Sequence, residues 1–155
     1  MKLKWHSLII LCTIILFNNF GFTLCAHASD IDDHRDCVYC GMDRKAYGYS
    51  RMLIQYQDGI SVGVCSLHCA VIELDGHPER TVKSLLVADR DTRELIEAEK
   101  AFWVMGGKKR GVMTPMPKWA FQTKEAAETF IKANDGKVVT WAEALASAQG
   151  EQGKH

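Results

Sequence analysis

The sequence predicts an α+β fold of two small β-β-α-β halves, related by an internal repeat and followed by a C-terminal helix. Short apolar segments come in pairs, and in each half a helix-forming segment that opens at a Ser or Thr follows the pair. A further short strand follows each helix, so the same order of elements occurs twice, over residues 29–92 and 93–155. The halves share this order without obvious sequence identity, which indicates a repeat of topology.

The first half contains the clearer strand pattern. An Asp-Gly pair in the turn at residues 57–59 separates two apolar segments, which is typical of a β-hairpin. The acidic, polar residues 29–36 ahead of them are expected to be frayed. In chain order, the expected elements are strand Met52–Tyr56, strand Ile60–Cys65, a helix capped by Ser66 that runs to about Leu74, and strand Val82–Ala88.

The second half carries the stronger helix-end patterns. Thr123 can cap a helix, and Glu125 near its start and Lys132 near its end agree with the helix dipole. Gly136 stands where a helix commonly ends. In chain order, the expected elements are strand Ala101–Met105, a Gly106-Gly107 break with a basic loop, strand Lys118–Gln122, the helix after Thr123, strand Val138–Thr140 and helix Trp141–Ala148.

Residues 1–28 have the pattern of a secretory signal peptide. Lys2 and Lys4 precede the apolar segment Leu8–Phe17, and Ala26-His27-Ala28 matches a small-x-small cleavage site. The apolar segment is shorter than the ~20 residues that a membrane-spanning helix needs. We therefore expect cleavage after Ala28 and export to the periplasm.

Two alternatives would tie the chain to a membrane. The signal could be retained as an anchor, or Cys25 could be lipidated, although Leu24 stands where bacterial lipoprotein signals carry a small residue. The charge of the chain gives no other reason to expect association with a membrane. Loss of residues 1–28 removes Lys2 and Lys4 from 19 basic residues and nothing from the 19 acidic ones, which leaves a slightly acidic chain. We therefore expect no nucleic acid partner and no polybasic membrane contact.

The motif Cys37-Val38-Tyr39-Cys40-Gly41-Met42 gathers three sulfur side chains within a short segment. Cys and Met together form a soft ligand set, and soft ligands select Cu(I) over harder divalent ions. Gly41 permits the sharp turn that brings Met42 back toward a bound ion, because glycine visits positive φ at little steric cost. The motif therefore predicts a Cu(I) site.

Cysteine counting leaves other interpretations open. Without residues 1–28 the chain keeps four of its 6 cysteines, and an even number in an exported protein is typical of a disulfide framework. All four together approximate a zinc-ribbon layout, which makes zinc the alternative metal and a zinc-stapled structural or sensing domain an alternative function. Cys37 and Cys40 alone could serve a thiol–disulfide oxidoreductase, although no thioredoxin-like β-α-β unit surrounds them.

A second cluster, Cys65-Ser66-Leu67-His68-Cys69, lies at the expected strand-to-helix junction. Cys65 and Cys69 stand near the start of the helix, where the dipole is expected to lower the thiol pKa and favour the thiolate that binds metal. His68 adds an imidazole ligand. Cys69 could instead be a buried core residue, as free cysteine often is. A hairpin brings its ends together, so this cluster and the first motif are expected to converge on one site or on two adjacent ones.

Met113 and Met116 lie in a Pro-rich loop, residues 111–117. Such loops usually lie at the surface, and exposed thioethers near thiols suit the capture of a soft metal. Met113 could equally fill a gap between the halves. The basic residues 108–110 just before this loop are expected to be solvated.

The Cys-x-x-Cys-Gly-Met motif, the repeated β-β-α-β order, the Gly-Val-Met at 111–113 and the segment 118–145 together resemble the NosL family, over residues 35–148. The resemblance implies an exported, Cu(I)-binding accessory protein of nitrous oxide reductase that supplies copper for metal-centre assembly in denitrification. It maps the family motifs onto Cys37, Cys40, Gly41 and Met42, and onto Gly111 and Met113. The segment 65–69 and the missing lipobox depart from many members.

The resulting hypothesis is a periplasmic Cu(I)-binding metallochaperone that is not an enzyme. Its partner would be a copper-accepting client enzyme or the assembly machinery of that enzyme. Delivery requires the metal to leave, so we expect an exposed, incompletely closed site. The candidate ligands are Cys37, Cys40, Met42, Cys65, His68, Cys69 and Met113.

Overall fold

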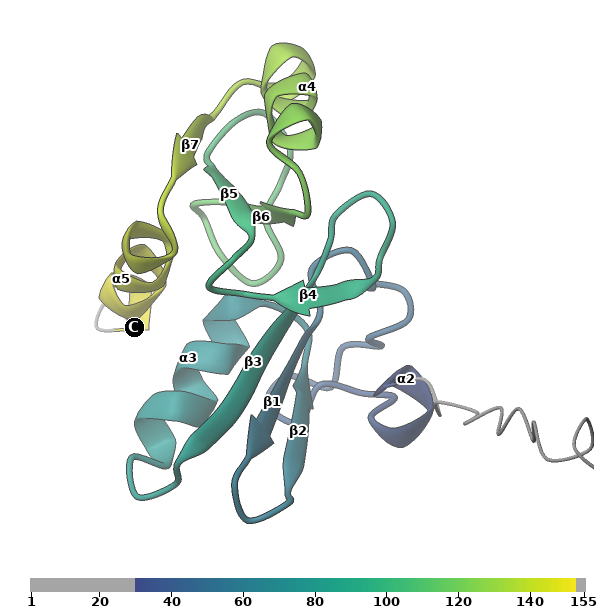
Figure 1. Cartoon of the computed structure of the whole chain (residues 1–155), viewed down its shortest axis with the longest axis vertical. Coiled ribbons are helices and arrows are strands. Elements are labelled where there is room, and N and C mark those ends of the chain that lie inside the picture. The colour runs from purple at the N-terminus through teal and green to yellow at the C-terminus, as the bar shows by residue number, and fades with distance from the viewer. Residues whose placement is uncertain (1–29, 153–155) are drawn as a thin grey trace, which may run out of the picture.

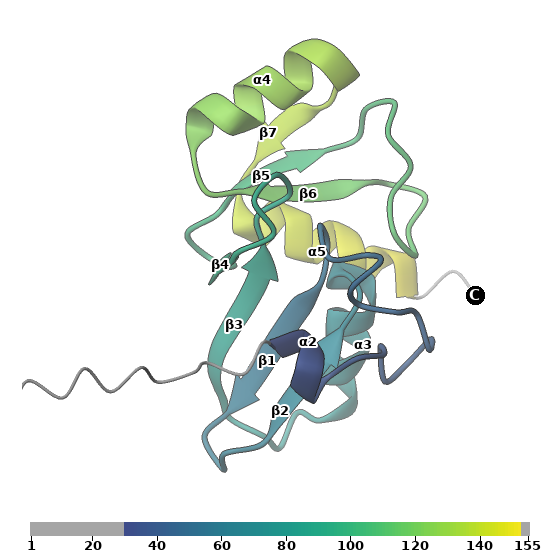
Figure 2. The same cartoon turned by 90° about the vertical axis from the view of Figure 1, so that its right-hand side faces the viewer.

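The computed structural model describes residues 30–152 of the 155-residue chain. The expected cleavage position after Ala28 and the alternative lipidation site Cys25 lie outside the described residues. Two antiparallel sheets follow one another along the long axis of the molecule, and helix α5 (Trp141–Gln152) returns to lie beside helix α3 (Leu67–Gly76) (Figure 1, Figure 2). No helix in the described part is long and apolar enough to cross a membrane.

The first sheet has four strands in the order β2-β1-β3-β4, and each strand runs antiparallel to its neighbours. Met52, at the start of β1, lies opposite Val64 on one side and Val87 on the other. The elements of this part are β1 (Met52–Tyr56), β2 (Ser61–Val64), α3, β3 (Val82–Ala88) and β4 (Leu95–Glu97).

The second sheet has three antiparallel strands in the order β6-β5-β7. In both sheets the first strand of the unit lies in the centre, between the second strand and the strand that follows the helix. The α+β fold class is therefore confirmed, and both units have the β-β-α-β order that the sequence predicts. The elements are β5 (Phe102–Met105), β6 (Lys118–Phe121), α4 (Lys124–Asn134), β7 (Lys137–Val139) and α5.

Strand β4 was not expected from the sequence. Its residues Leu95 and Glu97 pair with Ala88 and Leu86 of β3, so the first sheet continues past residue 92. A strand of three residues is too short to show a clear alternation of apolar and polar positions, which explains why it was missed. The division into halves at residue 92 stays a prediction.

The second sheet contributes buried side chains on both faces, since successive side chains of a strand point to opposite sides. Val104, Trp119 and Phe121 pack with Phe130 of α4 in one core cluster. Trp103 and Ala120 belong to a larger cluster, which also contains three buried cysteines and residues of α3, β1 and α5. The larger core is therefore shared between the two units.

The expected fraying of residues 30–36 is wrong. Asp30–Asp33 form a short helix, α2, and the Asp30 carboxylate accepts hydrogen bonds from Arg44 Nη2 at 2.8 Å and Arg51 Nη2 at 2.8 Å. Both guanidinium groups are nearly inaccessible to solvent. Arg44 also donates to the backbone oxygens of Met52 and Val64, so α2 is fixed to strands β1 and β2 of the first sheet.

Candidate metal centre

A tight loop presents the first pair of thiols. Residues Asp36 and Asp43 form an isolated bridge at its base, and the backbone nitrogen of Cys37 donates to the oxygen of Met42 at 2.9 Å. Gly41 donates to the oxygen of Cys37 and has a φ of 70°, with open space where a Cβ would stand. The turn that the sequence predicts at Gly41 is therefore present, and it closes residues 37–42 into a compact loop.

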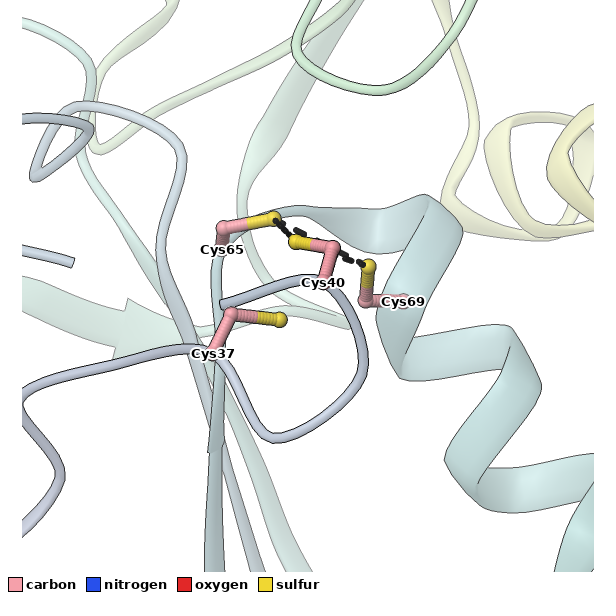
Figure 3. Close-up of side chains that lie close together, drawn as sticks. All are labelled: Cys37, Cys40, Cys65 and Cys69. Carbon is pink, nitrogen blue, oxygen red and sulfur yellow. Dashed lines mark hydrogen bonds between the residues drawn. The ribbon is translucent and has the colours of Figure 1, made fainter. Parts of the chain in front are cut away.

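The second pair of thiols comes from the junction of β2 and α3. Cys65 directly follows β2, and Cys69 lies in the first turn of α3. A separation of four residues places two side chains on the same side of a helix start. The loop of residues 37–42 lies against this junction, so thiols from two separate segments converge (Figure 3).

The four sulfur atoms lie within 4.8 Å of one another. The Sγ of Cys40 is 3.5 Å from that of Cys65 and 3.9 Å from that of Cys69, and the Sγ atoms of Cys65 and Cys69 are 3.7 Å apart. A tetrahedral site with metal–sulfur bonds of ~2.3 Å has sulfur–sulfur edges of ~3.8 Å. The thiols are free, and the three separations among Cys40, Cys65 and Cys69 match the edges of such a tetrahedron better than the ~2.05 Å bond of a disulfide.

The cysteine cluster is less exposed to solvent than the site that we expected from the sequence. Cys37, Cys65 and Cys69 are at most 2% exposed, while Cys40 is half-buried. The expectation of an exposed site is therefore wrong for three of the four thiols. They belong to the larger core, because the loop packs its inner side against α3 and β2.

The cluster favours a thiolate at Cys37 and thiols at Cys65 and Cys69. Hydrogen bonds from the thiols of Cys65 and Cys69, then those from the backbone N–H groups of Tyr39 and Cys40, lower the pKa of Cys37 far below its ordinary value despite burial. Donation to that thiolate, together with burial, raises the pKa of Cys65 to about 12 and also raises the pKa of Cys69. The lowering expected from the helix dipole at Cys65 and Cys69 is therefore wrong, because neighbouring sulfur atoms outweigh it.

His68 is not part of the cysteine cluster. Its Nδ1 lies 3.2 Å from Nε2 of Gln152 on α5, and its ring lines a surface pocket of about 420 Å³ together with Met113, Met116 and Glu151. Adjacent residues of a helix point about 100° apart, so Cys69 and His68 face different directions. The structure brings His68 and Met113 together, but on a separate surface.

The two methionines of the hypothesis occupy different surroundings. Met42 is partly buried and packs against the core that contains the cysteines. Met113 is 42% exposed, so it does not fill a gap between the units. Thr114 and Lys118 hold its loop by hydrogen bonds to the backbone oxygen of Met116 and to Glu151.

Sequence reasoning missed Glu73 and Tyr39. The Glu73 carboxylate is buried on α3 and accepts hydrogen bonds from the hydroxyl of Tyr39 at 2.7 Å and from that of Tyr56 at 2.9 Å. Burial, and then the bond to Glu73, raise the pKa of Tyr39 to about 12, so its hydroxyl stays protonated and donates. The spacing of four residues from Cys69 to Glu73 could have indicated an acid on the same helix face.

Comparisons with known proteins agree with this geometry. No curated protein matches the sequence significantly. Among solved structures, the chain is similar to the crystal structure of the copper chaperone NosL from Shewanella denitrificans, with a TM-score of 0.58 and 25% sequence identity. That similarity covers 75% of this chain and 93% of that chain. A family model described as NosL matches residues 28–148, which include both sheets and all four clustered cysteines, and the chain therefore belongs to the NosL family.

Proposed function

We propose that this protein is a copper chaperone that carries Cu(I) as cargo in the cluster of Cys37, Cys40, Cys65 and Cys69. The convergence of four thiols from two segments carries this proposal, because thiolates are soft ligands that select Cu(I) and the four sulfur atoms lie within 4.8 Å of one another. The similarity to a copper chaperone supports copper as the cargo. Met42, beside the same core, offers a further soft ligand.

Zinc is the competing metal, since four thiolates also form a closed structural zinc site. A thiol–disulfide oxidoreductase fits less well. A catalytic thiolate of that kind is expected to be partly exposed, whereas Cys37, which has the lowered pKa, is 2% exposed. The similarity to a chaperone likewise favours binding and release over catalysis.

The pocket of His68, Met113 and Met116 supports a second candidate role, the first capture of copper at the surface. Two thioethers that are 42% and 44% exposed share this pocket with an imidazole on α3, next in sequence to Cys69. Thioethers and imidazole are suitable Cu(I) ligands that cannot form disulfides. In this proposal the pocket loads the protein, and the cysteine cluster stores the ion.

We further propose export to the periplasm, after cleavage behind Ala28, and delivery of copper to nitrous oxide reductase or to its assembly machinery. The pattern of residues 1–28 supports the first part, and membership of the NosL family supports the second. Intact-mass analysis of protein from the native cell envelope should show a chain that starts at Ser29. A mass that starts at a lipidated Cys25 would contradict it.

Metal competition tests the proposed cargo. Reduced, metal-free protein is titrated anaerobically with Cu(I) and Zn(II) against a chromogenic chelator. Cu(I) should bind more tightly than Zn(II), and Cys37→Ser or Cys65→Ser should weaken Cu(I) by more than the 10- to 100-fold typical of a lost supporting residue. Val38→Ser changes an exposed side chain of the same loop and should leave the affinity unchanged. Tighter binding of zinc, or unchanged copper affinity in both cysteine variants, would contradict the proposal.

A further inference from the structure

The buried carboxylate of Glu73 joins three elements beside the cysteine cluster. It accepts a hydrogen bond from Tyr39 in the loop of residues 37–42 and another from Tyr56 at the end of β1. Arg80 Nη1 approaches the same carboxylate at 3.8 Å, and its guanidinium group lies over the Tyr56 ring. A charged group at 3% exposure needs such partners, so the position of each is strongly constrained.

In sequence, Tyr39 lies between Cys37 and Cys40, and Glu73 lies one helical turn after Cys69 on α3. The hydrogen bond of 2.7 Å therefore fastens the tip of the loop to the helix that supplies a facing thiol. The backbone hydrogen bonds of residues 37–42 all lie within the loop. Apart from contacts between thiols, the Tyr39–Glu73 bond is the hydrogen bond that ties residues 37–42 to the rest of the described chain.

Metal exchange requires this attachment to loosen. Cys65 directly follows β2, Cys69 lies in α3, and both belong to the core, so moving them would disturb the first sheet. Cys37 is also buried, but it belongs to a compact loop with its own internal hydrogen bonds. Lifting this loop is the smallest movement that opens the cluster, and that movement separates Tyr39 from Glu73.

We propose that Tyr39 and Glu73 are positioning residues of the metal centre, whose hydrogen bond latches the loop over the buried thiols and sets the rate of metal entry and release. The identity of the cargo rests on the function proposed above. The opening of the loop does not, because it governs access to the thiols in the metal-free protein as well.

The substitution Tyr39→Phe tests the latch, because it removes the hydroxyl and keeps the ring. A hydrogen bond to a charged group is strong enough for its loss to raise the open population about tenfold. Under native, reducing conditions, alkylation of Cys37 by iodoacetamide, followed by peptide mass spectrometry, should be about tenfold faster in this variant. Transfer of bound Cu(I) to a chelator should accelerate similarly, while the Cu(I)–thiolate absorption spectrum stays unchanged because the ligands are the same.

Tyr56→Phe is the matched control. It removes the other hydroxyl from the same carboxylate, at a more buried position outside the loop. It should destabilise the fold at least as much, yet leave both rates near those of the wild type. Equal rates in wild type and Tyr39→Phe, or equal acceleration in both variants, would overturn the latch. Faster alkylation in Tyr39→Phe without any copper binding would uphold the latch and overturn the proposed cargo.

Discussion

Cys40 differs from the other members of the cluster in its access to solvent. It is half-buried at the bend of the loop, whereas its three partners are enclosed in the core. Its Sγ is nevertheless within 3.9 Å of two of them. In the proposed copper site, this corner is the one that a ligand from a partner protein reaches first when the loop of residues 37–42 lifts. We therefore expect exchange of copper to begin with replacement of Cys40.

Asp30 is the centre of a separate charged network. One carboxylate accepts hydrogen bonds from two guanidinium groups, and both partners are almost fully buried. Arg51 also donates to the backbone oxygens of Gly48 and Arg93, so the network joins the start of the described chain to the loop after β3. Loss of the carboxylate would leave two buried positive charges without compensation.

We predict that Asp30→Asn lowers the free energy of unfolding by roughly 3–5 kcal/mol, the usual effect of removing one partner from a buried ion pair. Urea denaturation would measure the change. Glu97→Gln removes one partner of an exposed pair with Lys100 and serves as control, with an expected effect close to zero. Similar effects of both substitutions would contradict a special role of Asp30.

The same network predicts a pH dependence. Burial alone would raise the pKa of Asp30, but hydrogen bonds and charges of Arg51 and Arg44 lower it below 3.8. A carboxylate with a lowered folded-state pKa stabilises the fold above its unfolded pKa, and this stabilisation is lost as the pH falls through the folded-state value. Below about pH 4, wild-type protein should therefore lose more stability than Asp30→Asn does. Parallel losses would count against this assignment.

At the scale of single residues, the sequence could predict the local geometry of the cysteine motif better than which residues meet in the fold. The spacing of Cys37 and Cys40 and the turn at Gly41 depend on local geometry, so both could be anticipated. His68 was placed with the cysteines because it is near them in sequence, but the helix directs it to another surface. Partners such as Asp30 and Arg51 are brought together only by tertiary structure, and no local pattern identifies them.

The starts of helices α3 and α4 show the same contrast between local sequence and tertiary structure. Thr123 accepts a hydrogen bond from the backbone nitrogen of Ala126, as a capping residue should, whereas Ser66 occupies the cap position of α3 without a side-chain capping bond. The sequence predicts both caps equally well. At α3 the surrounding core fixes the helix start instead, since Ser66 is buried beside the thiol of Cys65.

We predict that Thr123→Ala lowers the free energy of unfolding by about 1 kcal/mol, because it leaves a backbone donor of α4 without its partner. Ser66→Ala removes a hydroxyl at the equivalent position of α3, but no capping bond, and should have a clearly smaller effect. Chemical denaturation of both variants checks the comparison. A larger loss in Ser66→Ala would show that the hydroxyl matters for another reason.

The whole molecule depends on a core to which both units contribute. Trp103, Ala144 and Ala148 from the second unit pack in the same cluster as Cys37, Cys65 and Cys69 from the first. Helix α5 makes this connection by returning to α3 (Figure 2). A repeat in topology therefore does not mean two independent folding units here.

We predict a single cooperative unfolding transition. All tryptophans of the described chain lie in the second unit, and all its cysteines lie in the first. Tryptophan fluorescence and thiol reactivity should therefore give the same urea midpoint. Ala148→Asp would place a charge in the shared core and should lower both midpoints together, whereas the exposed Ala146→Asp should lower neither appreciably. Two separate midpoints in the wild type would contradict the prediction.

The position of α5 also determines when the thiols become protected. Synthesis proceeds from the N-terminus, so the loop of residues 37–42 and the β2–α3 junction exist well before the last helix does. Until α5 docks on α3, the core around Cys37 and Cys69 lacks the packing contacts that α5 provides. For a time during synthesis, the thiols are therefore accessible to oxidants, to metals and to one another, before the complete fold encloses them.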